Sequence, residues 1–188
     1  MKHPVLIAVS LVALGLGGCG KKADTTVSDT PSGAAEGGLT AATTPAVAMS
    51  PGQTFANAAA ASDAFEIESS QLAENKAASA KIKSFAAQMI KAHTESTAKL
   101  KTAAGAASPA IVPDAQFTEM QRQTLSELGS KTGADFDAAY TKAQVDAHQA
   151  TLEAVKAYSG SGDAPSLKAF ATGLVPTVTA HLNMAKGL

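Results

Sequence analysis

The chain has 188 residues, a formal net charge of -1 and aromatic side chains at only 4% of its positions. This length gives room for one domain with a substantial core. Because the charge is nearly balanced and aromatic residues are scarce, the chain offers neither a basic field for phosphates nor platforms for bases, and we expect no nucleic-acid partner. Alanine dominates the apolar residues and tryptophan is absent, which favours closely packed helices, so the expected class is all-α.

The first 18 residues have the pattern of an export signal. Lys2 and His3 precede the apolar run from Val5 to Leu16. This run is too short to cross a bilayer core of about 30 Å, because a helix rises only ~1.5 Å per residue. We therefore predict that residues 1–18 are a signal peptide that is removed on export.

A cysteine follows this signal directly. The tetrapeptide Leu16-Gly17-Gly18-Cys19 resembles the bacterial lipobox, in which small side chains precede the cleavage site and the cysteine thiol receives a diacylglyceryl group. Cys19 is the only cysteine of the chain, so no intrachain disulfide can form. We predict a lipoprotein that is attached to the membrane through Cys19, in the bacterial cell envelope, on the outer membrane and facing the periplasm. The alternative is a signal peptide that contains a cysteine by chance.

Residues 19–52 consist mostly of Gly, Ala, Thr, Ser and Pro, with almost nothing large enough to bury. Such a segment is expected to be a flexible tether with a root-mean-square reach of roughly 30 Å. The alternative is a tract that is modified or binds the cell wall. The folded domain is then expected to comprise residues 53–188.

Within this domain, apolar residues at helical spacing predict four long helices and one short helix. The expected ranges are 53 to about 75–78, a second helix to about 103, a short helix after the candidate N-cap Asp114, 134–158, and a last helix from Pro165. Each long helix has one apolar face and requires partners to bury it. The sequence therefore predicts a helical bundle.

The long connection between the second and fourth helices favours one topology of bundle. Residues 105–133 are numerous enough to lead the chain back along the bundle. In that case the second and fourth helices run parallel, as in ferritin-like four-helix bundles, and the short helix lies in the crossover. The alternative is an up-down bundle with the short helix packed on its end.

Several spaced blocks of the domain resemble one bacterial family, the domain-of-unknown-function family 4142. The residues that carry the resemblance are Phe65, Glu66, Ile67, Glu68, Gln71, Leu72, Ala73 and Lys76, then Ile82, Lys83, Phe85, Ala86, Met89 and His93, then Phe136, Tyr140 and His148, and finally Leu167, Lys168, Phe170, Ala171, Leu174, Pro176, His181 and Leu182. The resemblance covers 53–188. It implies a ferritin-like fold and an exported bacterial protein, and it implies no established biochemical activity.

Three histidines of the domain are expected to point inward. His93 and His181 fall within the apolar stripes of their helices, and His148 flanks its own stripe, as Glu66 does on the first helix. One inward polar group from each long helix is the arrangement that bundle metal sites use. Glu66, His93, His148 and His181 are therefore the candidate ligands of a divalent metal ion, with zinc, copper or iron as the candidates.

Two features oppose a metal site. Di-iron bundles place a glutamate three residues before each ligand histidine, whereas those positions here are Ile90, Val145 and Val178. The expected helix ends also put Glu66 and His93 at depths that differ by roughly 6 Å, and the other two histidines by roughly 9 Å. The alternative is a buried polar layer, in which neutral imidazoles bind Glu66, Tyr140 or backbone carbonyls. Asp63, Glu68 and Glu74 are expected on solvated faces.

Nothing in the sequence identifies catalytic residues. The chain contains neither a nucleophile elbow nor a phosphate-binding loop with its lysine. The leading hypothesis is a lipid-anchored binding or interaction module of the envelope with an unknown ligand. The alternative is a metal-binding, ferritin-like envelope protein, and a hydrolytic enzyme ranks third.

Overall fold

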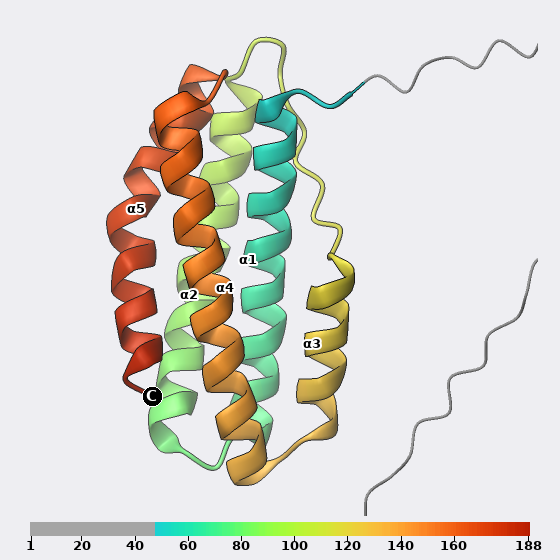
Figure 1. The fold of residues 1–188 in the computed structure, drawn as a ribbon, viewed down its shortest axis with the longest axis vertical. Helices are drawn as coiled ribbons and strands as arrows, with labels where there is room; N and C mark the ends of the chain where they lie inside the picture. The colour runs from blue at the N-terminus through green and yellow to red at the C-terminus, as the bar shows by residue number, and fades with distance from the viewer. Residues whose placement is uncertain (1–47) are drawn as a thin grey trace, which may run out of the picture. The chain divides into compact units, whose positions relative to one another are not determined.

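The computed structural model describes residues 48–188, which form five helices (Figure 1). The helices are α1 (Pro51–Lys76), α2 (Ala80–Gly105), α3 (Glu119–Ser130), α4 (Gly133–Ser161) and α5 (Pro165–Lys186). The predicted signal peptide, Cys19 and most of the predicted tether lie outside the described residues. None of the helices in 48–188 is long and apolar enough to span a membrane.

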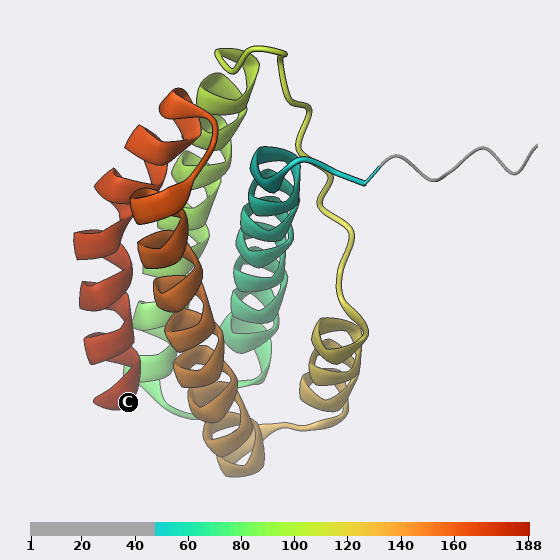
Figure 2. The same cartoon turned by 45° about the horizontal axis from the view of Figure 1, so that its top comes forward.

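The four long helices form a bundle that is built from two antiparallel hairpins. α1 packs against α2, α4 packs against α5, and the hairpins meet through α1 with α4 and α2 with α5. After α2, the chain returns along the outside of the bundle to α3, so that α2 and α4 run in the same direction (Figures 1 and 2). The predicted all-α, ferritin-like four-helix bundle with a short helix in its crossover is confirmed.

Capping side chains explain where the first three helices begin. Ser50 and Ser79 accept hydrogen bonds from the backbone at the starts of α1 and α2. α3 begins later than predicted, because Thr118 and Gln121 form a reciprocal capping box. The predicted cap, Asp114, instead lies before the helix and donates its backbone N–H to Asn57 Oδ1 at 3.0 Å.

Two apolar clusters fill the two ends of the bundle. One contains Phe55, Leu100 and Leu167, with the Phe55 ring stacked on Tyr158 at a centroid distance of 4.1 Å. The other contains Phe85, Met89, Phe136 and Tyr140. Between the clusters, each long helix contributes buried polar residues. This central layer comprises Asp63, Glu66, Ser69, Ser70, His93, Gln144, His148 and His181.

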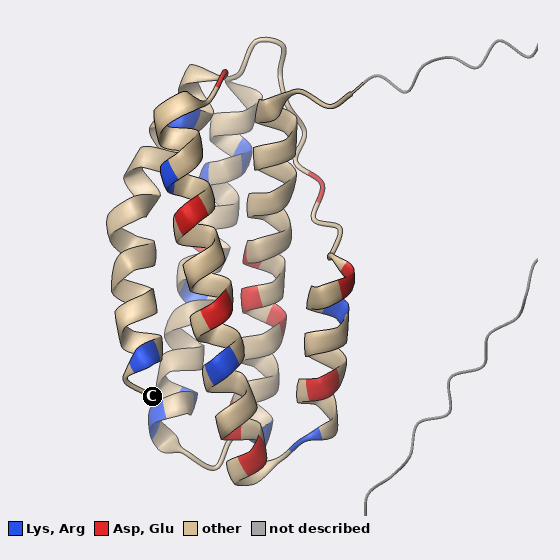
Figure 3. Cartoon of the chain, in the orientation of Figure 1, with Lys and Arg blue, Asp and Glu red and all other residues tan. Residues whose placement is uncertain are grey.

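Acidic and basic positions are interspersed along the bundle (Figure 3), and among residues 48–188 only Asp63 and Glu66 of them are buried. α5 is the exception. Its charged residues are Lys168 and Lys186, near its two ends. The central layer is therefore covered on the α5 side by a helix whose middle carries no charge.

Candidate metal centre

Three histidines from three different helices meet in the central layer. His93 of α2, His148 of α4 and His181 of α5 each offer one ring nitrogen, and these nitrogens lie within 4.8 Å of one another. The ring centroids are 5.5–5.8 Å apart. The side chains are almost completely buried, with exposed fractions of 7%, 1% and 9%. We call these three residues the histidine triad.

The end of α4 explains why the triad lies at one depth. The sequence predicts that α4 ends at Tyr158, which would separate His148 and His181 by roughly 9 Å along the bundle. α4 instead continues to Ser161. The remaining difference in depth between His148 and His181 is about three residues, or ~4.5 Å, and histidine side chains are long enough to bridge it. The expected mismatch in depth is therefore wrong for this pair.

Hydrogen bonds hold two of the rings in place. His93 Nδ1 lies 2.8 Å from Asp63 Oδ1, and Thr97 donates its hydroxyl to the other Asp63 oxygen at 3.2 Å. His148 Nδ1 lies 2.8 Å from the Gln144 carbonyl. In each ring this contact leaves Nε2 as the remaining nitrogen. Within residues 48–188, both Nε2 atoms and His181 Nδ1 are buried and have no hydrogen-bond partner.

The position of Asp63 differs from the prediction. A solvated face was expected, whereas Asp63 is only 5% exposed. The sequence contains one signal for this position, because Asp63 precedes the inward Glu66 by three residues and therefore shares a face of α1 with it. Glu68 and Glu74 are exposed, as predicted.

Glu66 lies beside the triad but is not a member of the group of converging ligand atoms. Its Oε1 is 3.7 Å from His148 Nδ1, and the residue is 1% exposed. Neither carboxylate oxygen accepts a hydrogen bond of good geometry from any described residue, although the Gln144 amide lies close enough to favour the charged form. Burial raises the pKa of Glu66 to about 7, and the positive charge of His93 opposes this rise.

The three imidazoles differ in their affinity for protons. Burial lowers the pKa of His148 to about 4, assisted by the charges of His93 and His181 and opposed by the hydrogen bond to the Gln144 carbonyl, and burial likewise lowers the pKa of His181 to about 4. Burial also acts to lower the pKa of His93, but the hydrogen bond to Asp63 and the charges of Glu66 and Asp63 outweigh it and raise that pKa. At neutral pH, His148 and His181 are therefore neutral and have lone pairs for a ligand.

Gln144 of the central layer and the adjacent Tyr140 bond to residues of α1. Gln144, which the sequence did not single out, donates from Nε2 to Ser69 Oγ at 3.2 Å. Tyr140 was a predicted partner of the histidines, but its hydroxyl is 2.8 Å from Ser70 Oγ instead. Both contacts join α4 to α1. They fix the register of these helices next to the triad.

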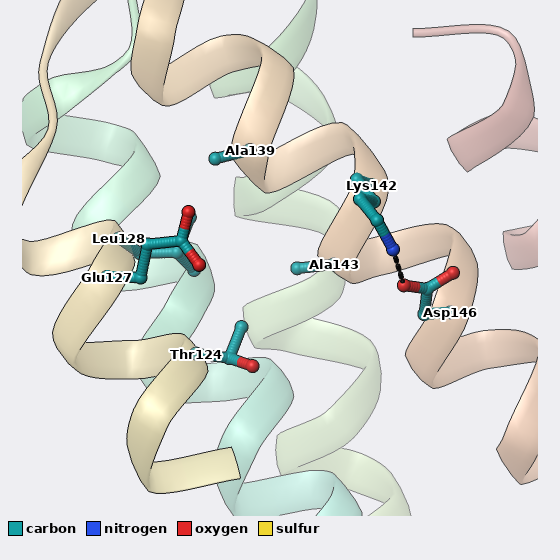
Figure 4. A pocket seen from close by; sticks show the side chains of 7 residues that line it. All are labelled: Thr124, Glu127, Leu128, Ala139, Lys142, Ala143 and Asp146. Carbon is teal, nitrogen blue, oxygen red and sulfur yellow. Dashed lines mark hydrogen bonds and ion pairs between the residues drawn. The ribbon is translucent and has the colours of Figure 1, made fainter. Parts of the chain in front are cut away.

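A separate hollow lies on the surface between α3 and α4 (Figure 4). Its volume is about 140 Å³, and Leu128, Ala139 and Ala143 contribute apolar side chains to it. Lys142 and Asp146 pair with each other at its edge. None of its lining residues belongs to the central layer, so the hollow is not an opening to the triad.

Comparisons with known proteins agree with this fold. The family model "Domain of unknown function (DUF4142)" matches residues 37–188. Among solved structures, CopM in its Cu(II)-bound form is similar with a TM-score of 0.61 and 16% identity, over 72% of this chain and 93% of CopM. CopM in its Cu(I)-bound form gives a TM-score of 0.60 and 15% identity, over 74% and 95% of the two chains. At such identity the likeness concerns the fold alone.

Comparison with curated proteins found no similar sequence. The family match covers most of the chain and includes the whole bundle. It also includes all members of the histidine triad. The chain therefore belongs to the DUF4142 family.

Proposed function

We propose that this protein is a metal-binding protein of the bacterial cell envelope, in which the histidine triad binds one copper ion. The observation that carries the proposal is the convergence of three buried imidazoles, with ligand atoms within 4.8 Å of one another. Imidazole is a favourable ligand for both copper and zinc. The ligand of the binding module predicted from the sequence is then the metal ion.

The hydrogen bonds of the histidine rings favour a metal site over a layer that has only a structural role. A structural layer of buried histidines is expected to satisfy both nitrogens of each ring. Here one nitrogen of His93 and one of His148 are bonded, and the remaining buried nitrogens have no partner in 48–188. Bonds from the second nitrogen to a carboxylate or a carbonyl are typical of metal-binding histidines, because they orient the ring.

Two considerations favour copper. The first disfavours iron, and the second favours copper over zinc. A set of three nitrogen donors suits copper and zinc, whereas di-iron centres require carboxylate ligands that this layer does not offer at the corresponding positions. CopM, which shares the fold, is described with both Cu(I) and Cu(II) bound. Zinc is the second candidate, and the titration described below also includes zinc.

The place of the protein in the cell is a further part of the proposal. The lipobox-like sequence that ends at Cys19 supports attachment to the membrane through lipid, with the bundle in the periplasm. A metal-binding domain at that position would intercept ions before they reach the cytoplasm.

The proposal is tested by metal titration of the full chain after treatment with a chelator. We expect one equivalent of Cu(I) or Cu(II) to bind more tightly than about 10 μM and to raise the unfolding midpoint by mass action. His93→Gln, His148→Gln and His181→Gln should each weaken binding by about 10–100-fold or more. Tyr140→Phe, which removes a buried hydroxyl next to this layer, serves as the control and should retain the affinity.

Failure of the wild-type chain to bind copper at this level would overturn the proposal. Copper binding that survives all three histidine substitutions together would do the same, because the ion would then lie elsewhere. Binding of zinc alone would keep the triad as a metal centre and reject copper as its ion.

A further inference from the structure

Glu66 is a buried carboxylate that the surrounding side chains do not satisfy. Both of its oxygens lack a hydrogen-bond partner among residues 48–188, and it is 1% exposed. Asp63, the other buried acid of α1, is bonded to His93 and Thr97. Buried carboxylates in proteins are normally paired, hydrogen-bonded or bound to a metal. The difference between the two acids indicates that Glu66 has oxygen lone pairs left over for a cation.

The position of Glu66 matches that of a fourth ligand. The triad draws on α2, α4 and α5, and Glu66 belongs to α1, the long helix that supplies no histidine. Its Oε1 lies 3.7 Å from His148 Nδ1, the ring nitrogen that faces the Gln144 carbonyl. Rotation of the flexible Glu66 side chain past this ring is required to bring an oxygen to an ion held at Nε2. With Glu66, all four helices of the bundle would contribute to the coordination of one ion.

We propose that Glu66 makes the site sensitive to the charge of its ion: it joins the histidine triad when a divalent ion binds and remains outside the coordination sphere when Cu(I) binds. This inference rests on the proposed function. A divalent ion gains twice the Coulomb energy from the carboxylate that a monovalent ion gains. Zn(II) adopts four-coordinate sites with oxygen among its ligands, and Cu(II) takes nitrogen and oxygen donors, whereas Cu(I) is a softer ion.

The test compares Glu66→Gln with wild type in the full chain. The amide keeps the shape and removes the negative charge. We expect affinities for Zn(II) and Cu(II) to fall by at least about tenfold, while the affinity for Cu(I) changes by less than about threefold. The reduction potential of bound copper should rise by about 59 mV for each tenfold loss of Cu(II) affinity relative to Cu(I). Glu68→Gln makes the same change on the exposed face of α1 and should alter none of these values.

A second measurement needs no variant. Infrared difference spectra of the wild-type chain should show a shifted carboxylate band when Zn(II) binds and no such shift when Cu(I) binds. Equal losses of affinity for all three ions in Glu66→Gln, or no loss for any, would overturn the inference while leaving the triad as the metal centre. A wild-type chain that binds none of the ions would overturn the proposed function, and the inference with it.

Discussion

Six buried side-chain atoms in the described part of the chain have no hydrogen-bond partner, and all of them belong to the central layer. Each such atom costs free energy, commonly about 1–3 kcal/mol, when it is removed from water without compensation. All of this cost falls on one layer that lies between two well-packed apolar clusters. Such a distribution is expected of a ligand site. A layer that served only to fix helix register would reduce the cost by pairing these groups with one another.

The unsatisfied carboxylate of Glu66 leads to a prediction for the metal-free protein. Burial raises the pKa of Glu66 to about 7 from its ordinary value of 4.5. Between these values the folded chain holds a proton that the unfolded chain has lost, so Glu66 reduces stability as pH rises from 4.5 to about 7. Glu66→Gln should therefore be nearly neutral at pH ~4.5 and should raise the free energy of unfolding by roughly 3 kcal/mol above pH ~7.

Denaturant unfolding of the chelator-treated protein at several pH values measures this difference directly. The control is Glu68→Gln, which changes an exposed carboxylate of the same helix and should give a flat difference. A Glu66→Gln variant that is destabilised by the same amount at every pH would show that the carboxylate is satisfied in the folded protein. Greater stability of the metal-free variant together with weaker divalent binding would indicate that Glu66 is retained for its ligand.

The direction of the histidines could be predicted from the sequence, but their partners could not. Helical periodicity places His93, His148 and His181 on inward faces, because it requires only the pitch of a helix. The contacts of Asp63 and Gln144 with this layer were not predicted, because a hydrogen bond depends on side-chain rotamers and on the neighbouring helix. The preference of a carboxylate for water also argued for exposure of Asp63, and the buried His93 ring overrides that preference.

At the scale of elements, some helix boundaries could be predicted from the sequence and others could not. Pro165 begins α5 as predicted, because its ring suits the first turn. The start of α3 was misplaced, since Asp114 resembles a cap in isolation and Thr118 forms the better reciprocal pair. The predicted end of α4 was three residues short. That error produced about half of the expected mismatch in depth, because each residue moves a side chain by ~1.5 Å along the bundle.

At the scale of the whole molecule, the length of the crossover decided the topology. A connection of a few residues would force α4 to run antiparallel to α2, whereas the segment between α2 and α4 is long enough to return along the bundle and to include α3. This arrangement brings the two hairpins together with their histidines on facing surfaces. The ligand set could not be read from topology, because it depends on which side chains share one level.

The proposed attachment to the membrane also concerns the whole molecule. If Cys19 carries two or more acyl chains, at ~0.8 kcal/mol for each buried methylene, the wild-type protein should sediment with membranes and incorporate labelled palmitate. Cys19→Ser should lose the label and be released or remain an uncleaved precursor. Gly20→Ser introduces the same residue one position later and should keep the label. An unlabelled wild-type protein that is cleaved and freely secreted would contradict the lipid anchor.

The most direct test of a copper site in the bundle is anomalous X-ray diffraction at the copper edge from crystals of the copper-loaded protein. We predict one strong peak in the central layer, with one nitrogen each of His93, His148 and His181 at about 2 Å from it. Peaks only at exposed side chains, or an interior peak that lacks contact with all three imidazoles, would contradict the proposed metal centre.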